Sequence, residues 1–146
     1  ALPILVSSWG QCLPLIQGQT ELGFDLQKIY WPGALTMIFK KTAAVPDYLT
    51  AGKDTIAIRM PNHPAPLFLA ENLGAPITGT SANLSGEPDA LTLEDLSVQV
   101  INQVDMVLDV KPSPLGTAST ILDLSGSEPV IIRHGALNIE RELKAI

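Results

Sequence analysis

The sequence predicts an α/β protein, a mixed β-sheet with helices packed on it. Short, continuous apolar runs are bounded by proline, glycine and polar residues, as is typical of strands inside a sheet. Some of these runs alternate with helical patterns, and others follow one another directly. That order predicts a mixed sheet. No repeat or low-complexity tract divides the 146 residues, so we expect a single domain over residues 1–146.

The strands are predicted from apolar runs between turn residues. PILVSS, at 3–8, has apolar side chains in succession, which suits a strand buried on both faces. WPG, at 31–33, makes a turn ahead of the next run. In chain order, the predicted strands are residues 3–8, 34–40, 55–60, 76–80, 106–110, 119–124 and 129–133.

A well-marked helix is predicted over residues 62–74. Asn62 can cap its first turn, because a side-chain oxygen there accepts an otherwise unbonded backbone N–H. Pro64 suits the first turn, where its missing N–H costs nothing. Gly74 suits the left-handed position just past the helix end.

A second helix is predicted over residues 92–104. Thr92 and Asp95 have the spacing of a capping box. Apolar residues also recur on one helical face: Leu93, Leu96, Val100 and Val104. A short charged helix, residues 138–146, is predicted to follow the last strand.

Charge and composition narrow the function. Nine basic and fifteen acidic residues give a net charge of −6, so long-range electrostatics do not favour broad nucleic-acid binding. Any RNA contact must therefore be local. No apolar run approaches the length of a membrane span, so we expect a soluble protein without membrane association.

The lone cysteine and the histidines exclude further kinds of site. Cys12 cannot form an internal disulfide, which favours a reducing compartment and a cytoplasmic location. No basic residue adjoins it, so we expect an inert thiol. His63 and His134 are too few and too separated for a metal centre, and no metal site is predicted.

The arginines point to an anionic ligand. Alternate residues of a strand share a face, which places Thr55 and Arg59 on one face, roughly 13 Å apart at about 3.3 Å per residue. A guanidinium among apolar residues is costly without an anionic partner. Arg133 ends another apolar run in the same way. The alternative, for each arginine, is a structural ion pair or a strand end that reaches water.

Ser119 stands at the entrance of a predicted strand. The loop before it, KPSPLGTA, contains proline and glycine and could bring backbone amides close to a ligand. The alternative is an ordinary turn that initiates a strand.

The segment TGTSANLSGEP, at 78–88, concentrates small hydrogen-bonding groups after an apolar run. Gly79 would let a ligand approach the backbone, and Ser81 and Asn83 follow the strand's carboxyl end, where open α/β sheets bind ligands. Hydroxyl, amide and backbone N–H groups suit phosphate or carboxylate oxygens. The spacing fits neither a Walker loop nor GxGxxG, so a polar turn remains the alternative.

Six segments, in this order, resemble the YrdC-like threonylcarbamoyl-AMP synthases: PILVSS, WPGALTMIFKK, TIAIRMPNHP, PITGTSANLSGEP, ASTILDLS and VIIRHGAL. They extend over nearly the whole chain with the family's spacing. The resemblance implies an α/β fold whose twisted sheet lines a large concave site. It also implies a nucleotidyltransferase that makes threonylcarbamoyl-AMP and pyrophosphate from L-threonine, bicarbonate and ATP, with magnesium on the phosphates.

The resemblance also implies roles for particular residues. Thr55, Ser81 and Arg133 match ATP contacts, as do Asn83 and Asp89, the latter at a site that the family often fills with serine. Contacts to threonine or its carbamate match Arg59, Ser119 and the backbone near Gly79. No residue matches a dedicated acid or base. The implied partners are tRNA, whose adenosine beside the anticodon is modified, and the proteins that modify it.

The chain departs from the family pattern in one respect. Ser81 and Asn83 match the second half of a signature, KxR followed later by SxN, whose first half normally precedes the strand PILVSS. We therefore expect the chain to lack an N-terminal strand-helix segment and to be part of a longer protein. We expect weak or absent catalysis from the chain alone.

Two other functions are compatible with the sequence. One is a non-catalytic RNA-binding module, although the acidic balance and the lack of interleaved basic and aromatic residues disfavour it. The other is the YrdC-like domain of a carbamoyltransferase that matures hydrogenases. Flanking zinc-finger or acylphosphatase segments would favour that function.

Overall fold

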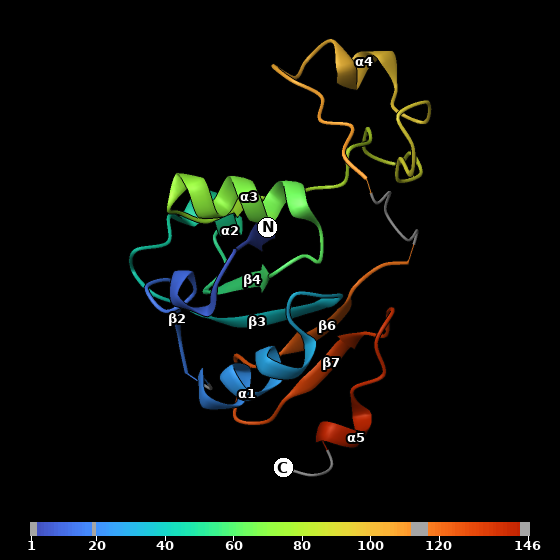
Figure 1. Ribbon diagram of the computed structural model, residues 1–146. Coiled ribbons are helices and arrows are strands. Elements are labelled where there is room, and N and C mark those ends of the chain that lie inside the picture. The colour runs from blue at the N-terminus through green and yellow to red at the C-terminus, as the bar shows by residue number, and fades with distance from the viewer. Residues whose placement is uncertain (1–2, 19, 112–116, 144–146) are drawn as a thin grey trace. The chain divides into compact units, whose positions relative to one another are not determined.

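The computed structural model describes residues 3–18, 20–111 and 117–143 (Figure 1). Its internal contacts divide the chain into two compact units. The first unit comprises Ala1–Gly79 and Ala118–Ile146, and the second comprises Thr80–Thr117. All of the described strands belong to the first unit.

The first unit is built on one mixed sheet, as predicted. Its strand order is β5-β1-β4-β3-β6-β7, and β2 pairs with β3 beside this path. The pairs β1–β4 and β3–β6 are parallel and the other pairs are antiparallel. The strands are β1 (Ile4–Leu5), β2 (Ile16–Gln17), β3 (Leu35–Lys41), β4 (Thr55–Arg59), β5 (Ile77–Thr78), β6 (Thr120–Asp123) and β7 (Val130–Arg133).

Helices flank this sheet, which completes the predicted α/β class. In the first unit they are the 3-10 turn η1 (Trp9–Gln11) and the helices α1 (Thr20–Tyr30), α2 (Asp47–Thr50), α3 (Pro64–Leu73) and α5 (Glu140–Leu143). Among the described residues, no helix is long and apolar enough to cross a membrane.

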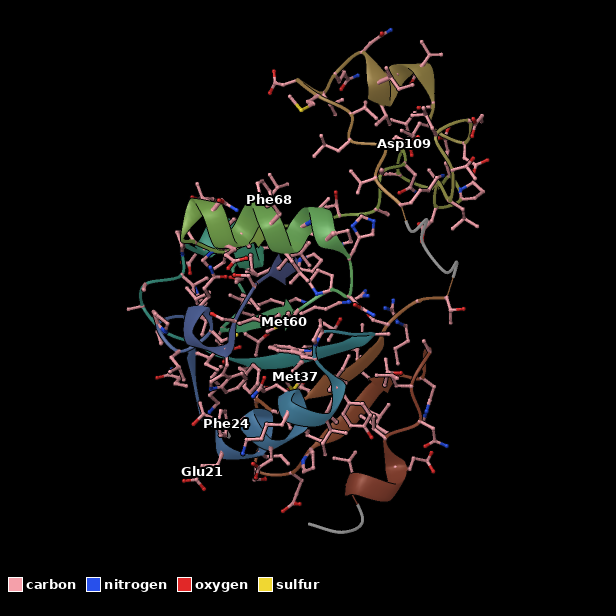
Figure 2. All side chains as sticks on the ribbon, in the orientation of Figure 1. Glu21, Phe24, Met37, Met60, Phe68 and Asp109 are labelled. Atoms are coloured by element: carbon pink, nitrogen blue, oxygen red, sulfur yellow. The ribbon has the colours of Figure 1, made fainter. Side chains whose placement is uncertain are left out.

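One face of the sheet forms the hydrophobic core. Met37 and Phe39 of β3, Ile58 of β4 and Leu122 of β6 are fully buried, and Leu26 of α1 belongs to the same cluster. Figure 2 shows Met37 among the side chains of this core. Burial of these apolar side chains orients the sheet, because their strand neighbours must then point to the opposite face.

The ends of α3 agree with the predicted signals, except for the residue that caps it. Pro64 is the first helical residue, and Gly74 ends the helix with φ +67°. The cap is His63, whose Nδ1 accepts a hydrogen bond from the N–H of Ala65 at 3.2 Å. The expectation for Asn62 was therefore wrong by one residue, because the imidazole can take the acceptor role that a carboxamide usually takes.

The second unit holds less regular structure than its sequence predicts (Figure 1). The helix expected at 92–104 is confined to α4 (Val98–Ile101), and residues 106–110 are exposed and form no strand. Asp95 does accept the N–H groups of Leu91 and Thr92, at 3.0 and 2.8 Å, as in a capping box. The cap closes a turn that does not propagate, because the described residues of this unit contribute none to the hydrophobic core and leave Leu93 and Val104 exposed.

Leu122→Ala should lower the free energy of unfolding by about 2 to 5 kcal/mol, because it empties a fully buried position in β6. Ile132→Ala, on the neighbouring strand, should change it by no more than about 0.5 kcal/mol, because that side chain is 57% exposed. Urea denaturation followed by tryptophan fluorescence measures both. Equal losses would contradict the assignment of the core face.

Candidate functional site

The face of the sheet opposite the core carries the polar residues of β4. Along this strand Ile56 and Ile58 are buried, whereas Thr55, Ala57 and Arg59 are half-buried. The alternation confirms the prediction that Thr55 and Arg59 share a face. We call this side the open face of the sheet.

The strand register places Arg59 and Arg133 on one row of the open face. Met37 pairs with Ile58, and continuing that antiparallel register by one residue brings Thr36 opposite Arg59. Thr36 in turn pairs with Ile121, which pairs with Arg133. Two strands, β3 and β6, therefore separate the arginines, and their row crosses both strands.

A register shift in β7 brings Arg133 to this row. Ile131 pairs with Leu122 on the core face, so in a regular strand Arg133 would also point toward the core. The pairing shifts between Ile121 and Leu122, and Arg133 pairs with Ile121 instead. A bulge of this kind adds one residue to one strand and redirects the side chain that follows it.

Arg59 is held by a backbone carbonyl rather than by a carboxylate. Its Nε donates to the carbonyl oxygen of Gly33 at 2.8 Å. Gly33 is fixed from the other side, since its N–H donates to the carbonyl of Met60 at 2.8 Å. A Cβ on Gly33 would lie 2.3 Å from the carbonyl oxygen of Tyr30, so the WPG turn requires glycine there.

Arg133 makes two hydrogen bonds to Ser119. Its Nε donates to the carbonyl oxygen at 3.0 Å, and its Nη2 donates to Oγ at 3.1 Å. The chain after β7 passes close to the same residue, because a Cβ on Gly135 would lie 2.4 Å from the carbonyl carbon of Ser119. The structure thus joins Ser119 and Arg133, which are predicted to contact different substrates.

The two arginines form a positive centre. Burial, and next the positive charge of Arg133, lower the pKa of Arg59 from its ordinary value. Within the described parts of the chain, no carboxylate forms an ion pair with either arginine. The alternative of a structural ion pair is therefore excluded for those parts. The alternative of a strand end that reaches water is met by Arg133, which is exposed at the end of β7. Like charges held on one sheet face without a counter-ion favour the binding of an anion.

The other predicted residues of the first unit lie on the same sheet. Thr55 is half-buried at the start of β4 and pairs with Lys40. Gly79 donates its N–H to the carbonyl of Pro3 at 2.8 Å, so that group is used within the sheet. A Cβ on Gly79 would lie 2.7 Å from Cδ1 of Leu5, so packing also requires a residue without a side chain there.

The second unit contains the other three predicted residues, Ser81, Asn83 and Asp89, in a segment rich in turns. Ser81 and Asp89 are exposed, and Asn83 is half-buried. The Nδ2 of Asn83 donates to the carbonyl oxygen of Glu87, across a turn in which Gly86 has φ +91°. Asn83 therefore has a structural role in closing this turn, and its assignment to ATP remains a prediction.

One member of the site was missed by the sequence analysis. Thr36 is 5% exposed, and its Oγ1 lies 2.9 Å from Oγ of Ser119. The available signal was a threonine inside the apolar run ALTMIFK, where a buried hydroxyl needs a partner. That partner lies 83 residues away in the sequence, directly before β6, so the sequence could not show the contact.

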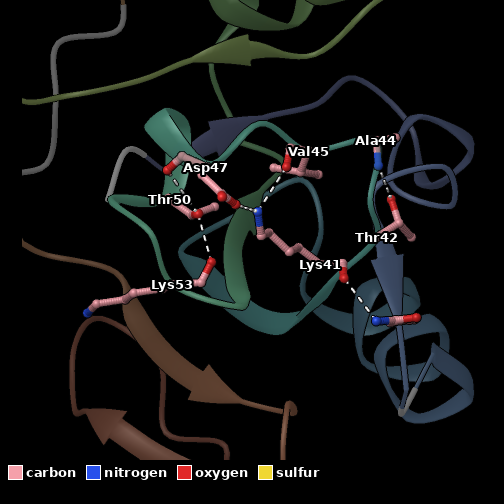
Figure 3. A network of polar contacts seen from close by, with 8 residues as sticks. Lys41, Thr42, Ala44, Val45, Asp47, Thr50 and Lys53 are labelled. Atoms are coloured by element: carbon pink, nitrogen blue, oxygen red, sulfur yellow. Dashed lines mark hydrogen bonds and ion pairs between the residues drawn. The ribbon is translucent and has the colours of Figure 1, made fainter.

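Two hollows of about 410 and 450 Å³ lie next to Lys40 and contain none of the predicted site residues. The first includes Lys41, whose Nζ bonds the carbonyl of Val45 and the carboxylate of Asp47 (Figure 3). Hydrogen bonding and charge from Lys41 lower the pKa of Asp47. Because that cation already has an anion, we place the candidate site at the arginines, which form no ion pair with any carboxylate that the structure describes.

The described residues offer no protein ligands for a metal ion. They contain no group of three or more histidine, cysteine, aspartate or glutamate side chains arranged to hold one. His63 serves as the cap of α3, and His134 is exposed. The guanidinium, hydroxyl and backbone donors of the site can bind and orient anionic groups.

The family model and the similar proteins found by comparison indicate the same family. The family described as "Telomere recombination", of Sua5, YciO and YrdC, matches residues 1–135. The threonylcarbamoyl-AMP synthase of Pyrococcus abyssi is 34% identical over 99% of this chain and 43% of its own length. That of Bacillus subtilis is 39% identical over 83% of this chain and 35% of its own length. The chain thus spans less than half of these two relatives.

A solved structure extends the similarity to the fold. P. abyssi Sua5 in complex with L-threonine superimposes with a TM-score of 0.87 at 34% identity. The match covers 99% of this chain and 43% of that structure.

Cys12 should not act as a nucleophile. Its thiol is fully buried, and burial raises its pKa to about 12, whereas an unfolded cysteine ionises near pH 8.5. Iodoacetamide at pH 8.5 should therefore label the native protein very slowly and the urea-unfolded protein rapidly, as mass spectrometry can measure. The protonated thiol also means that stability is lost as the pH rises from about 8.5 toward 12. Rapid labelling of the native protein would contradict both statements.

Proposed function

Because the chain belongs to the Sua5/YciO/YrdC family, we propose that it forms the synthase domain of an L-threonylcarbamoyl-AMP synthase. The reaction joins L-threonine, bicarbonate and ATP into threonylcarbamoyl-AMP and releases pyrophosphate. The observation that carries this proposal is the pair formed by Arg59 and Arg133, which have no carboxylate partner among the described residues. Each substrate presents anionic oxygens to such a centre: L-threonine through its carboxylate, ATP through its phosphates, and bicarbonate directly.

Threonine is assigned to Arg59 and Ser119, with the backbone near Gly79. Arg59 keeps its Nη groups available among the described residues, because its Nε alone is used by Gly33. A guanidinium with both Nη groups available can bind a carboxylate through paired hydrogen bonds. The complex of P. abyssi Sua5 with L-threonine supports a threonine site in a protein of the same fold.

ATP is assigned to Arg133, Thr55, Ser81, Asn83 and Asp89. Support comes from the hydrogen bonds between Arg133 and Ser119, since they hold a residue assigned to ATP beside a residue assigned to threonine. Adenylation requires that proximity. No described protein cluster fits Mg²⁺, so we expect the ion to arrive on the phosphates of ATP as part of the substrate.

The chemistry follows from positioning and charge. The threonine amine, deprotonated, first reacts with bicarbonate to give the carbamate and water. A carbamate oxygen then attacks the α-phosphorus, and the bond to the β-phosphate oxygen breaks with its electron pair leaving on pyrophosphate. Arg59 and Arg133 would align the reacting groups and stabilise the negative charge that moves onto the leaving group.

The proposed role in the cell follows from the product. Threonylcarbamoyl-AMP is a reactive mixed anhydride, so an enzyme that modifies a tRNA adenosine should consume it. We accordingly propose tRNA-modification proteins as partners and the cytoplasm as the location.

Arg59→Ala should weaken L-threonine binding to the full chain by about 1.5 to 3 kcal/mol, the cost of losing a charge-assisted hydrogen bond. Lys53→Ala is the matched control, because it removes a positive charge from an exposed position in the same unit. Isothermal titration calorimetry measures both affinities. Equal affinities for the two variants would refute the threonine assignment.

Ser81→Ala should weaken ATP binding by about 1.5 to 3 kcal/mol, as expected for one hydrogen bond to a charged phosphate oxygen, and leave threonine affinity unchanged. Ser85→Ala, which removes another exposed hydroxyl from the same segment, should alter neither. The enzyme proposal as a whole fails if the wild-type chain binds duplex RNA tightly at physiological salt but binds neither ATP nor L-threonine.

A further inference from the structure

Thr36 places a buried hydroxyl beside the proposed threonine site. It lies on the same row of the open face as the two arginines, between Arg59 and Ile121 in the strand register. The only hydrogen bond of its hydroxyl to a described residue is with Oγ of Ser119, at 2.9 Å. A valine would have the same shape and would suit a buried strand better, so the hydroxyl requires an explanation.

Hydrogen-bond accounting around Ser119 suggests one. A serine hydroxyl has one hydrogen to donate and two lone pairs that accept. Arg133 can only donate, so its Nη2 occupies one lone pair of Ser119 Oγ. If Thr36 donates as well, both lone pairs are occupied and the hydrogen of Ser119 is left for another acceptor.

The opposite direction of this hydrogen bond would leave the unused hydrogen on Thr36 instead of on Ser119. If Ser119 donated to Thr36, the hydrogen of Thr36 would be the one without an acceptor among the described residues. That hydrogen would belong to a strand-interior hydroxyl that makes no hydrogen bond to an arginine among the described residues. The hydrogen of Ser119, by contrast, adjoins the guanidinium that is expected to hold the anion.

We propose that Thr36 is a positioning residue that donates to Ser119 and so makes the Ser119 hydroxyl a dedicated donor to the substrate. The acceptor would be an anionic oxygen, which we assign to the carboxylate of L-threonine. This inference rests on the proposed function, because the identity of the ligand does. It assigns Thr36 an effect on affinity that acts only through Ser119.

The test is a double-mutant cycle on the full chain, with L-threonine as the probe in isothermal titration calorimetry. Thr36→Val removes the donor but keeps the shape, and should weaken binding about threefold to tenfold, the range of one neutral hydrogen bond. Thr36→Ser should restore wild-type affinity. In a Ser119→Ala background, Thr36→Val should have no further effect, because the residue through which it acts is gone.

Thr50→Val is the matched control. Thr50 is also a buried threonine, 1% exposed, and its hydroxyl donates to the carbonyl of Lys53 at 2.7 Å, away from the arginines (Figure 3). Its substitution should lower the melting temperature without changing the affinity for L-threonine. A purely structural role for Thr36 would give the same pattern as Thr50.

The outcomes separate this inference from the proposed function. Unchanged affinity in Thr36→Val, or an equal loss with and without Ser119, would overturn the positioning role alone. If the wild-type chain binds no L-threonine, the proposed function fails and this inference fails with it. Should Thr36→Val not fold, Thr36→Ala repeats the cycle. In addition, wild type should prefer L-threonine over L-threoninol, which lacks the carboxylate, and Ser119→Ala should reduce that preference.

Discussion

Two guanidinium groups on one sheet face impose an electrostatic cost on the folded chain. Arg59 loses hydration on burial and is repelled by Arg133, and no described carboxylate offsets either effect. Neutral acceptors hold both groups instead, namely the carbonyl of Gly33 and the carbonyl and hydroxyl of Ser119. These hydrogen bonds fix the directions of the two guanidinium groups without neutralising their positive charge. An anionic ligand would relieve the repulsion that the fold maintains, which couples binding to the stability of the site.

The hydrophobic core is what keeps the arginines in this position. Burial of Ile58 and Leu122 fixes the faces of β4 and β6, and a one-residue slip would expose those side chains. The turn at Gly33 and the chain crossing at Gly135 then bring backbone so close that a Cβ would not fit at either residue. Apolar packing thus fixes which face each strand side chain points to, and close backbone contacts fix the positions of the carbonyl groups that hold the arginines.

The second unit shows how far local signals reach without a core. Asp95 binds the backbone as its spacing predicts, and these hydrogen bonds lower its pKa. The helix nevertheless begins only at Val98, and residues 106–110 remain exposed and outside any strand. A cap satisfies one or two N–H groups, but helix propagation and strand pairing need a surface on which to bury apolar side chains.

The sequence by itself determined the α/β class, the alternation that puts Thr55 and Arg59 on one face, and the end of α3 at Gly74, because these depend on residues close together in the chain. Only the tertiary structure decided that a register shift turns Arg133 to the open face and that Thr36 meets Ser119. Both depend on pairing between strands distant in sequence, which is set by the packing of the whole sheet and not by any local pattern.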